Sequence, residues 1–245
     1  MKVAFLGATK GIGRALARLM AERGDVLFLL GRDTADLERS ARDLEVRAGQ
    51  GRFGTAPCDL ERPETFAPAL AAAEAALGGL DAVVVTAGLF ATQDRLEEDV
   101  ELARRLVTAN FANTVVFCEH ARKRLLAGGG GTLCVFSSVA GERGRKPVAI
   151  YGAAKAGLSR YLEALDHKFR DRGLRTVCVK PGFVKTSMTD GLPVPPFAGE
   201  PEAVARRVLR AIDRGQPVVY APAIWRWIML VIRLLPRFVM RKIGF

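Results

Sequence analysis

The sequence has few residues that could bind a metal ion or form disulfides. It contains only four cysteines and two histidines, and no C-x-x-C pair occurs. Three of the cysteines lie in apolar runs such as Leu133-Cys134-Val135-Phe136, which is typical of reduced residues in a hydrophobic core. We therefore expect no metal site and no disulfide framework, which favours an intracellular protein.

Long hydrophobic segments are missing at both ends of the chain. Met1 is followed almost at once by a strand pattern and a glycine-rich loop, leaving no room for a secretory signal. The apolar run at residues 224–235 is far shorter than the roughly 20 residues that span a bilayer. We therefore expect a cytoplasmic protein without a membrane-spanning helix.

Acidic residues are outnumbered by basic ones, 26 to 37, and the formal net charge is +11. Such a charge suits nucleic acid, an anionic membrane surface or a phosphorylated small molecule. Nucleic-acid binding needs a clustered basic surface with groups that stack on bases or bond to them. Aromatic residues make up only 7% of the sequence, and cations alternate with acids outside the C-terminal tail, so we expect no nucleic-acid partner.

Apolar segments of strand length alternate with helix-length segments. The strands are expected at residues 2–6, 26–30, 52–56, 82–85, 132–136, 175–179 and 217–220, with helices that include 35–48, 63–76 and 98–126. This alternation predicts an α/β fold: a Rossmann-type, doubly wound parallel sheet of about seven strands with helices on both faces. We expect one domain over residues 1–221, a proline-rich mobile flap at 187–201, and an amphipathic helical tail at 222–245.

The first expected strand leads directly into a glycine-rich loop and then a helix. The loop is Gly7-Ala8-Thr9-Lys10-Gly11-Ile12-Gly13. Glycines allow the backbone to approach a pyrophosphate closely, and the helix N-terminus favours its negative charge. Strand, loop and helix together predict a dinucleotide site.

The end of the second expected strand indicates which dinucleotide binds. An NAD-binding protein has an acidic residue there for the ribose hydroxyls, whereas this chain has Gly31-Arg32. The guanidinium of Arg32 suits a 2′-phosphate, and Lys10 can approach the same group. We therefore expect NADP(H) rather than NAD, although both cations could instead be solvated surface residues.

Tyr151 and Lys155 are four residues apart at the start of an expected helix, so their side chains share one face. A lysine cation beside a phenol should lower the pKa of the phenol and make it a proton donor or acceptor near neutral pH. The spacing alone is common in helices, so the pair gains its meaning from other motifs.

Taken together, the motifs resemble those of the short-chain dehydrogenase/reductase family. The motifs are residues 7–13, Asp59 with Leu60, Ala87-Gly88, Asn110, Ser138, Tyr151, Lys155, and Pro181-Gly182-Phe183-Val184-Lys185-Thr186. Two positions depart from the usual pattern. Thr86 stands where the family often has asparagine, and Lys180 before Pro181 is unusual.

The resemblance implies a role for each of these residues. Tyr151 would exchange a proton with the carbonyl oxygen, Ser138 would hold that oxygen, and Lys155 would also bind the nicotinamide ribose. Asn110 would position a water that links Lys155 to solvent. Asp59 and Leu60 would contact the adenine, and the segment from Pro181 and Gly182 through Val184 and Thr186 would contact the nicotinamide and phosphates.

The tail combines apolar residues with cations and has no acidic residue. Arg226 and Arg233 are seven residues apart, so they should share a helical face that Arg237 and Arg241 extend. Two interpretations stay open: contact with a lipid or with an anionic membrane at the inner face of the plasma membrane, or coverage of the substrate cleft or of a subunit interface in a dimer or tetramer. The segment 138–143, the Pro-Gly segment and the tail also resemble reductases of a decaprenylphosphoryl 2-keto-pentose.

These features predict the reduction of a ketone to a secondary alcohol with NADPH. The carbonyl substrate is a small molecule or is lipid-linked, with the cations at 143–146 suited to a phosphate. A reductase of 3-oxoacyl or other small hydrophobic ketones is the first alternative. An inactive NADPH-binding scaffold is the second, although it should have lost part of the proton-transfer set, which is intact here.

Overall fold

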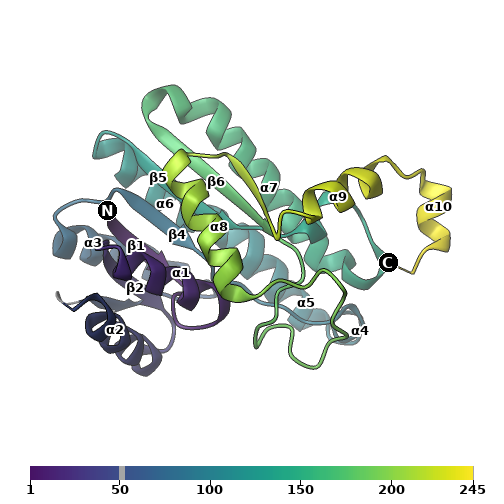
Figure 1. Cartoon of the computed structure of the whole chain (residues 1–245), viewed down its shortest axis with the longest axis horizontal. Helices are drawn as coiled ribbons and strands as arrows, with labels where there is room; N and C mark the ends of the chain where they lie inside the picture. The colour runs from purple at the N-terminus through teal and green to yellow at the C-terminus, as the bar shows by residue number, and fades with distance from the viewer. Residues whose placement is uncertain (50–52, 245) are drawn as a thin grey trace.

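A parallel sheet forms the centre of the molecule, as predicted (Figure 1). The computed structural model describes residues 1–49 and 53–244, and within them the sheet has seven strands in the order β3-β2-β1-β4-β5-β6-β7. The strands are β1 (Lys2–Leu6), β2 (Val26–Gly31), β3 (Thr55–Pro57), β4 (Ala82–Val85), β5 (Gly131–Phe136), β6 (Leu174–Pro181) and β7 (Val218–Ala221).

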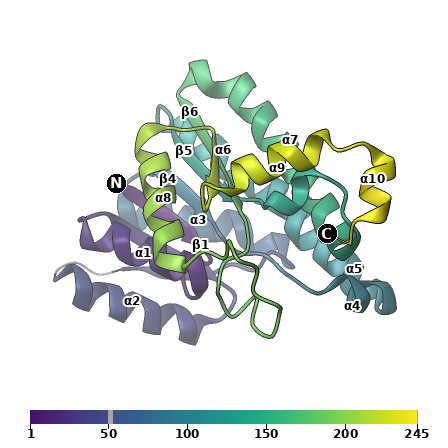
Figure 2. The same ribbon diagram turned by 45° about the vertical axis from the view of Figure 1, so that its right-hand side comes forward.

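Alternating residues of each central strand pack against helices on opposite faces of the sheet. In β1, Val3 and Phe5 belong to one core cluster, whereas Ala4 and Leu6 belong to the other. The first face is covered by α1 (Gly11–Glu22), α2 (Thr34–Ala48) and α8 (Pro201–Arg214), and the second by α3 (Phe66–Leu77), α6 (Thr114–Ala127) and α7 (Ala149–Phe169) (Figure 2). Because both faces are buried, the central strands are mostly apolar.

The third strand is shorter and starts later than the expected segment 52–56. It comprises Thr55–Pro57, and Arg52 lies outside the described residues. Gly54 just before it already accepts a hydrogen bond from Leu29 N, at 2.8 Å, and Cys58 just after it donates to Gly31 O, at 2.9 Å, whereas Pro57 has no N–H to offer to a further strand. β3 is therefore a short edge strand.

The expected helix at 98–126 is divided into several elements. α4 (Gln93–Glu98) and α5 (Val100–Val107) precede a π-helical turn at Thr108–Asn113, which continues into α6. Within this region the hydroxyl of Thr114 donates a hydrogen bond to the carbonyl of Ala109, five residues earlier, at 2.7 Å. Single π turns in helices often mark functional sites, and this one contains Asn110.

The C-terminal tail forms two short helices that project from the end of β7 (Figure 1). They are α9 (Trp225–Leu234) and α10 (Arg237–Lys242), and Pro236 separates them. Trp225, Met229 and Ile232 are buried in a small cluster with Val139, so one face of α9 packs on the main body. In the described part of the chain, no helix is long and apolar enough to cross a bilayer.

Candidate active site

The residues expected to form the site follow the carboxyl ends of neighbouring strands. The glycine loop follows β1, Arg32 follows β2, Asp59 and Leu60 follow β3, Ala87-Gly88 follow β4, Ser138 follows β5, and Pro181-Gly182 end and follow β6. All these strands are parallel, so their carboxyl ends meet at one edge of the sheet. In open α/β sheets this edge is where ligands bind.

The glycine loop lies so close to the segment after β4 that side chains are excluded. Gly7 has a φ of +99°, and a Cβ there would lie 2.6 Å from Ala87 N. A Cβ on Gly13 would lie 2.1 Å from the carbonyl oxygen of Gly7. The hydroxyl of Thr86 donates to that same carbonyl at 2.8 Å, so Thr86 connects the loop to β4.

The N-terminus of α1 is suited to an anion such as a pyrophosphate. Lys10 occupies the N-cap position but makes no side-chain cap hydrogen bond, and the first turn contains no acidic residue. The backbone N–H groups of the first turn of α1 and the positive end of its helix dipole are thus available to phosphate oxygens. Thr186 closes the other side, because its Cγ2 would be only 3.2 Å from a Cβ on Gly11.

Cations gather at the start of α2, where an adenosine ribose would lie. Lys10 Nζ lies 3.5 Å from Asp36 Oδ2 and stays largely exposed. Arg32, also exposed, ends the turn after β2. The nearby Asp33 caps α2, because its carboxylate accepts a hydrogen bond from Asp36 N at 3.0 Å. One oxygen of this carboxylate is therefore engaged with the helix.

The ammonium group of Lys155 is buried beside the ends of β4 and β5. Its Nζ donates to the carbonyl of Phe136 at 2.9 Å. A Cβ on Gly88 would lie 3.7 Å from this Nζ and 2.9 Å from Asn110 Oδ1, so three predicted site residues meet here. Ser137 fixes the same turn of α7 by donating to the Lys155 carbonyl at 2.9 Å.

The amide of Asn110 is held by the backbone of one residue. Its Oδ1 accepts from Leu89 N and its Nδ2 donates to Leu89 O, each at 2.7 Å. The π-helical turn therefore holds the segment after β4 beside Lys155. The family role of positioning water stays a prediction.

Burial sets the protonation of the Tyr151–Lys155 pair. It raises the pKa of Tyr151 to about 12, and a hydrogen bond with Ser138 acts in the opposite direction. It also lowers the pKa of Lys155 to about 8. The expectation that Lys155 lowers the pKa of the phenol below its usual value is therefore wrong for the protein without ligand. Lys155 Nζ lies 5.8 Å from the Tyr151 ring centre, and desolvation of the phenolate outweighs this attraction.

A protonated phenol is the correct form for giving a proton to a carbonyl oxygen. Ser138 lies beside it and accepts a hydrogen bond from Ala140 N at 3.0 Å, which leaves its hydroxyl hydrogen for another acceptor. Phe90 packs edge-on against the Tyr151 ring, with the ring centres 5.2 Å apart. The arrangement can therefore hold a carbonyl oxygen and protonate it.

A buried charge cluster next to the site was not predicted from sequence. The side chain of Glu142 is only 5% exposed and pairs with Lys180 and with Arg233, the latter at 3.1 Å. Tyr220 also donates its hydroxyl to Glu142 at 3.0 Å. The cluster joins β6, β7 and α9 to the segment after Ser138. The unusual Lys180 was the sequence feature that could have revealed this cluster, because a lysine at the end of a buried strand requires a counter-ion.

The loop expected to bind phosphate instead supports the tail. Arg143 donates to the carbonyl of Leu235 at 2.8 Å, and Lys146 donates to that of Arg241 at 2.7 Å. Both carbonyls lie at the C-terminal ends of helices, where cations are favoured. These two cations are therefore engaged, which weakens the case for a phosphate at this loop.

Trp225 connects the start of the tail to the segment expected to be a flap. A Cβ on Gly182 would lie 2.0 Å from its indole nitrogen, so the ring covers the Pro-Gly turn after β6. The same nitrogen donates to the carbonyl of Phe197 at 3.3 Å. The segment at 187–200 contains no helix or strand, as its prolines predicted, while its mobility stays a prediction.

Comparison with known proteins identifies relatives of similar length. Residues 2–193 match the family described as short chain dehydrogenase. An uncharacterised oxidoreductase of Mycobacterium tuberculosis is 34% identical over 240 residues, covering 98% of this chain and 96% of the relative. Carbonyl reductase family member 4 of Xenopus tropicalis is 29% identical, with 86% and 90% covered. A short-chain dehydrogenase/reductase from Mycobacterium ulcerans has the same fold, with a TM-score of 0.82 at 23% identity and coverage of 89% and 86%.

The pKa values predict how carbonyl reduction depends on pH. Tyr151 stays protonated up to about 12, whereas Lys155 loses its proton as pH rises through about 8. The rate should therefore be level near neutral pH and fall above about 8, measured from the absorbance of the reduced nicotinamide cofactor. Lys155→Met should abolish activity, and the exposed Lys168→Met should keep the parent profile. A rate that stays constant to pH 10 would contradict this assignment.

Removing the charge of Glu142 should destabilise the protein. Glu142→Gln leaves Lys180 without its buried counter-ion, so we expect the free energy of unfolding to fall by about 3 kcal/mol in urea titrations. Adding Lys180→Met to that variant should recover part of the loss. Glu163→Gln is the matched control, because Glu163 pairs with Arg160 on the surface and should change stability by less than about 1 kcal/mol. Equal effects of the two glutamine substitutions would refute the cluster's importance.

Proposed function

Because the chain belongs to the short-chain dehydrogenase family and is thus an oxidoreductase acting between C=O and CH–OH groups, we propose that it reduces a ketone to a secondary alcohol with NADPH. The observation that carries the proposal is the buried Lys155 beside a protonated Tyr151 and Ser138. The intact set also disfavours an inactive NADPH-binding scaffold.

The residues around the glycine loop fit a dinucleotide, and those near α2 favour NADP. The uncapped N-terminus of α1 would hold the pyrophosphate, with Thr186 opposite. Arg32 and Lys10 would bind the 2′-phosphate, because Asp33 is already engaged as a helix cap. Bound NADPH would supply the hydride.

The protein's own groups would handle the proton. Ser138 donates a hydrogen bond to the substrate oxygen, and Tyr151 transfers its phenolic proton to that oxygen as the alcohol forms. The ammonium group of Lys155 then stabilises the phenolate that is left, in a site where water is largely excluded. The reverse reaction would start from that phenolate.

A lipophilic or lipid-linked ketone is the substrate that we favour. Val194 and Phe197 expose apolar side chains on the segment that Trp225 joins to the Pro-Gly turn. The C-terminal half also resembles reductases of a lipid-linked keto-pentose. The similarity to a carbonyl reductase supports the alternative of a 3-oxoacyl or other small hydrophobic ketone. We further propose a cytoplasmic location and a homodimer or homotetramer.

A panel of ketones tests this function directly. Polar, acyl and lipid-linked ketones are mixed with the enzyme and NADPH, and the loss of NADPH absorbance is followed. We expect lipophilic ketones to give the highest kcat/KM and Tyr151→Phe to lower it by at least about 100-fold for each active substrate. Turnover that survives in Tyr151→Phe would refute the proton-transfer role. A preference for small polar ketones would refute only the substrate class.

The choice of NADPH is tested at Arg32. Arg32→Asp should weaken NADPH binding about 10- to 100-fold and improve NADH binding, because it exchanges a charge-assisted contact for a repulsion. Dissociation constants come from cofactor fluorescence titration. Arg42→Asp is the matched control, since Arg42 is an exposed cation further along α2 that should leave the preference unchanged. Equal affinities of the parent for the two cofactors would contradict the assignment.

A further inference from the structure

The two faces of α9 are both apolar, but only one of them is covered. Trp225, Met229 and Ile232 are buried against the main body. Trp227 and Val231 lie on the opposite face and are each 61% exposed. Leu234 is 76% exposed and Phe238 of α10 is 65% exposed. Contiguous exposed apolar side chains of this size commonly mark interaction sites, so this outer face is suited to a partner.

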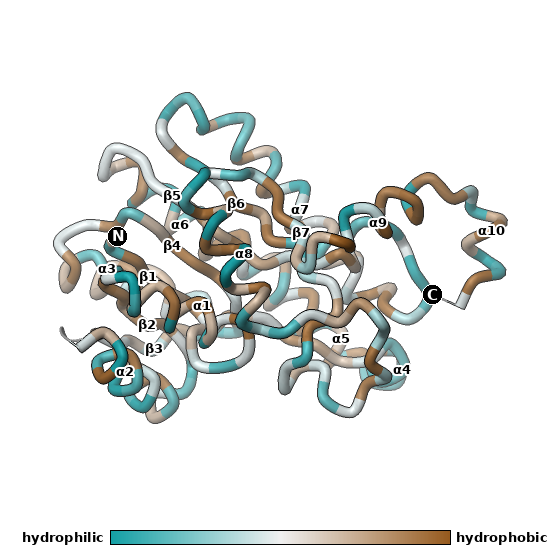
Figure 3. Tube along the Cα trace, viewed as in Figure 1, coloured by the Kyte–Doolittle hydropathy of each residue, from teal (hydrophilic) through white to brown (hydrophobic). Residues whose placement is uncertain are grey.

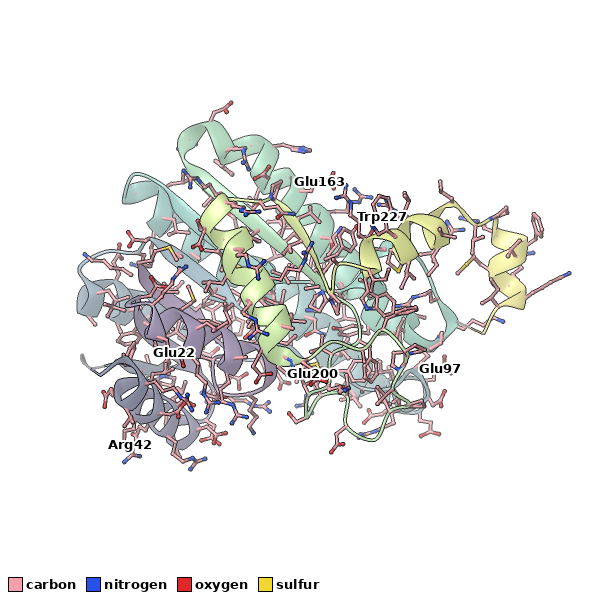
Figure 4. The ribbon with its side chains drawn as sticks, in the orientation of Figure 1. Glu22, Arg42, Glu97, Glu163, Glu200 and Trp227 are labelled. Carbon is pink, nitrogen blue, oxygen red and sulfur yellow. The ribbon has the colours of Figure 1, made fainter. Side chains whose placement is uncertain are left out.

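The outer face lies on a part of the molecule that projects into solvent. Figures 1 and 2 show α9 and α10 extending away from the sheet and its helices. The tail contains several hydrophobic segments along its course (Figure 3), and the side chain of Trp227 lies on the outer side of α9 (Figure 4).

Cations surround the apolar face. Arg226, Arg237, Arg241 and Lys242 are exposed, and no acidic residue occurs in residues 222–245. Arg226 and Arg233 both lie in α9 at the expected spacing of seven residues, and Arg233, although 46% exposed, also pairs with Glu142. The partner that complements such a face is apolar inside and anionic at its surface.

We propose that the outer face of α9 and α10 docks on an anionic lipid bilayer. Trp227, Val231, Leu234 and Phe238 enter the boundary between headgroups and acyl chains, and the exposed cations contact the headgroups. A second copy of the chain fits less well, since a symmetric contact between the same faces would bring like charges together. The docking surface does not depend on the identity of the ketone.

Several contacts fix the tail to the catalytic domain, so docking of the tail also positions that domain. Arg233 is held by the buried Glu142, and Arg143 and Lys146 bind backbone carbonyls of the tail. Val139, which follows Ser138, packs in the same cluster as the inner face of α9. A docked enzyme therefore holds the segment after Ser138 close to the lipid surface.

Vesicle binding by the full chain tests the proposal. Trp225 and Trp227 are the only tryptophans in the sequence, so tryptophan fluorescence, excited selectively, reports on α9 alone. Vesicles of phosphatidylglycerol and phosphatidylcholine should cosediment with the protein and shift its emission to shorter wavelength. Pure phosphatidylcholine should bind at least about tenfold more weakly, and added salt should weaken binding to the anionic vesicles.

Variants locate the binding face. Val231→Asp and, separately, Leu234→Gln should weaken binding to anionic vesicles, the first by at least about tenfold. Val46→Asp is the matched control, because Val46 is an exposed valine of α2 that is 83% exposed and should leave binding unchanged. Thermal unfolding curves, monitored by circular dichroism, verify that each variant is folded.

Two results would overturn the proposal. One is a parent chain that fails to bind anionic vesicles, or that binds them as tightly as folded Val231→Asp and Leu234→Gln do. The other is a parent chain that does not bind vesicles but sediments as a dimer in sedimentation velocity, while the Val231→Asp variant sediments as a monomer. That result would assign the face to contact between two copies.

Discussion

The ammonium group of Lys155 is buried where β4 and β5 end, and much of the site depends on how that charge is held. The carbonyl of Phe136 accepts its hydrogen bond, and Gly88 lacks a side chain that would crowd the neighbouring amide of Asn110. Burial lowers its pKa and raises that of Tyr151, so the phenol stays protonated over the neutral range. The parallel sheet supplies the geometry, because only its carboxyl edge brings the ends of these strands together.

The same edge is reinforced from the side of the tail. Glu142 is buried four residues after Ser138 and binds Lys180, Tyr220 and Arg233. A charge cluster of this kind contributes little net stability relative to apolar packing, but it is costly to break. It thus fixes how α9 sits beside the catalytic residues. The inner face of α9 packs on the main body, and its outer face stays exposed for a partner.

Much of this arrangement was predictable from local sequence patterns. The alternation of apolar strands with helices predicted the sheet, and the glycine loop and the Tyr151–Lys155 spacing predicted where the chemistry would lie. Contacts between distant residues were not predictable. The π-helical turn at Asn110 interrupts an apparently continuous helix, and Arg233 faces Glu142, 91 residues away in sequence. The pKa of Tyr151 also depends on burial, which the spacing to Lys155 does not reveal.

The most direct test of this account is a titration of Lys155 itself. Heteronuclear NMR of lysine side chains, assigned with Lys155→Met, follows its Cε and Nζ signals as pH changes in the protein without cofactor. We predict a midpoint near pH 8, because burial lowers the pKa of Lys155 to about 8. A midpoint above about 10, as for a solvated lysine, would contradict the buried cation on which the site depends.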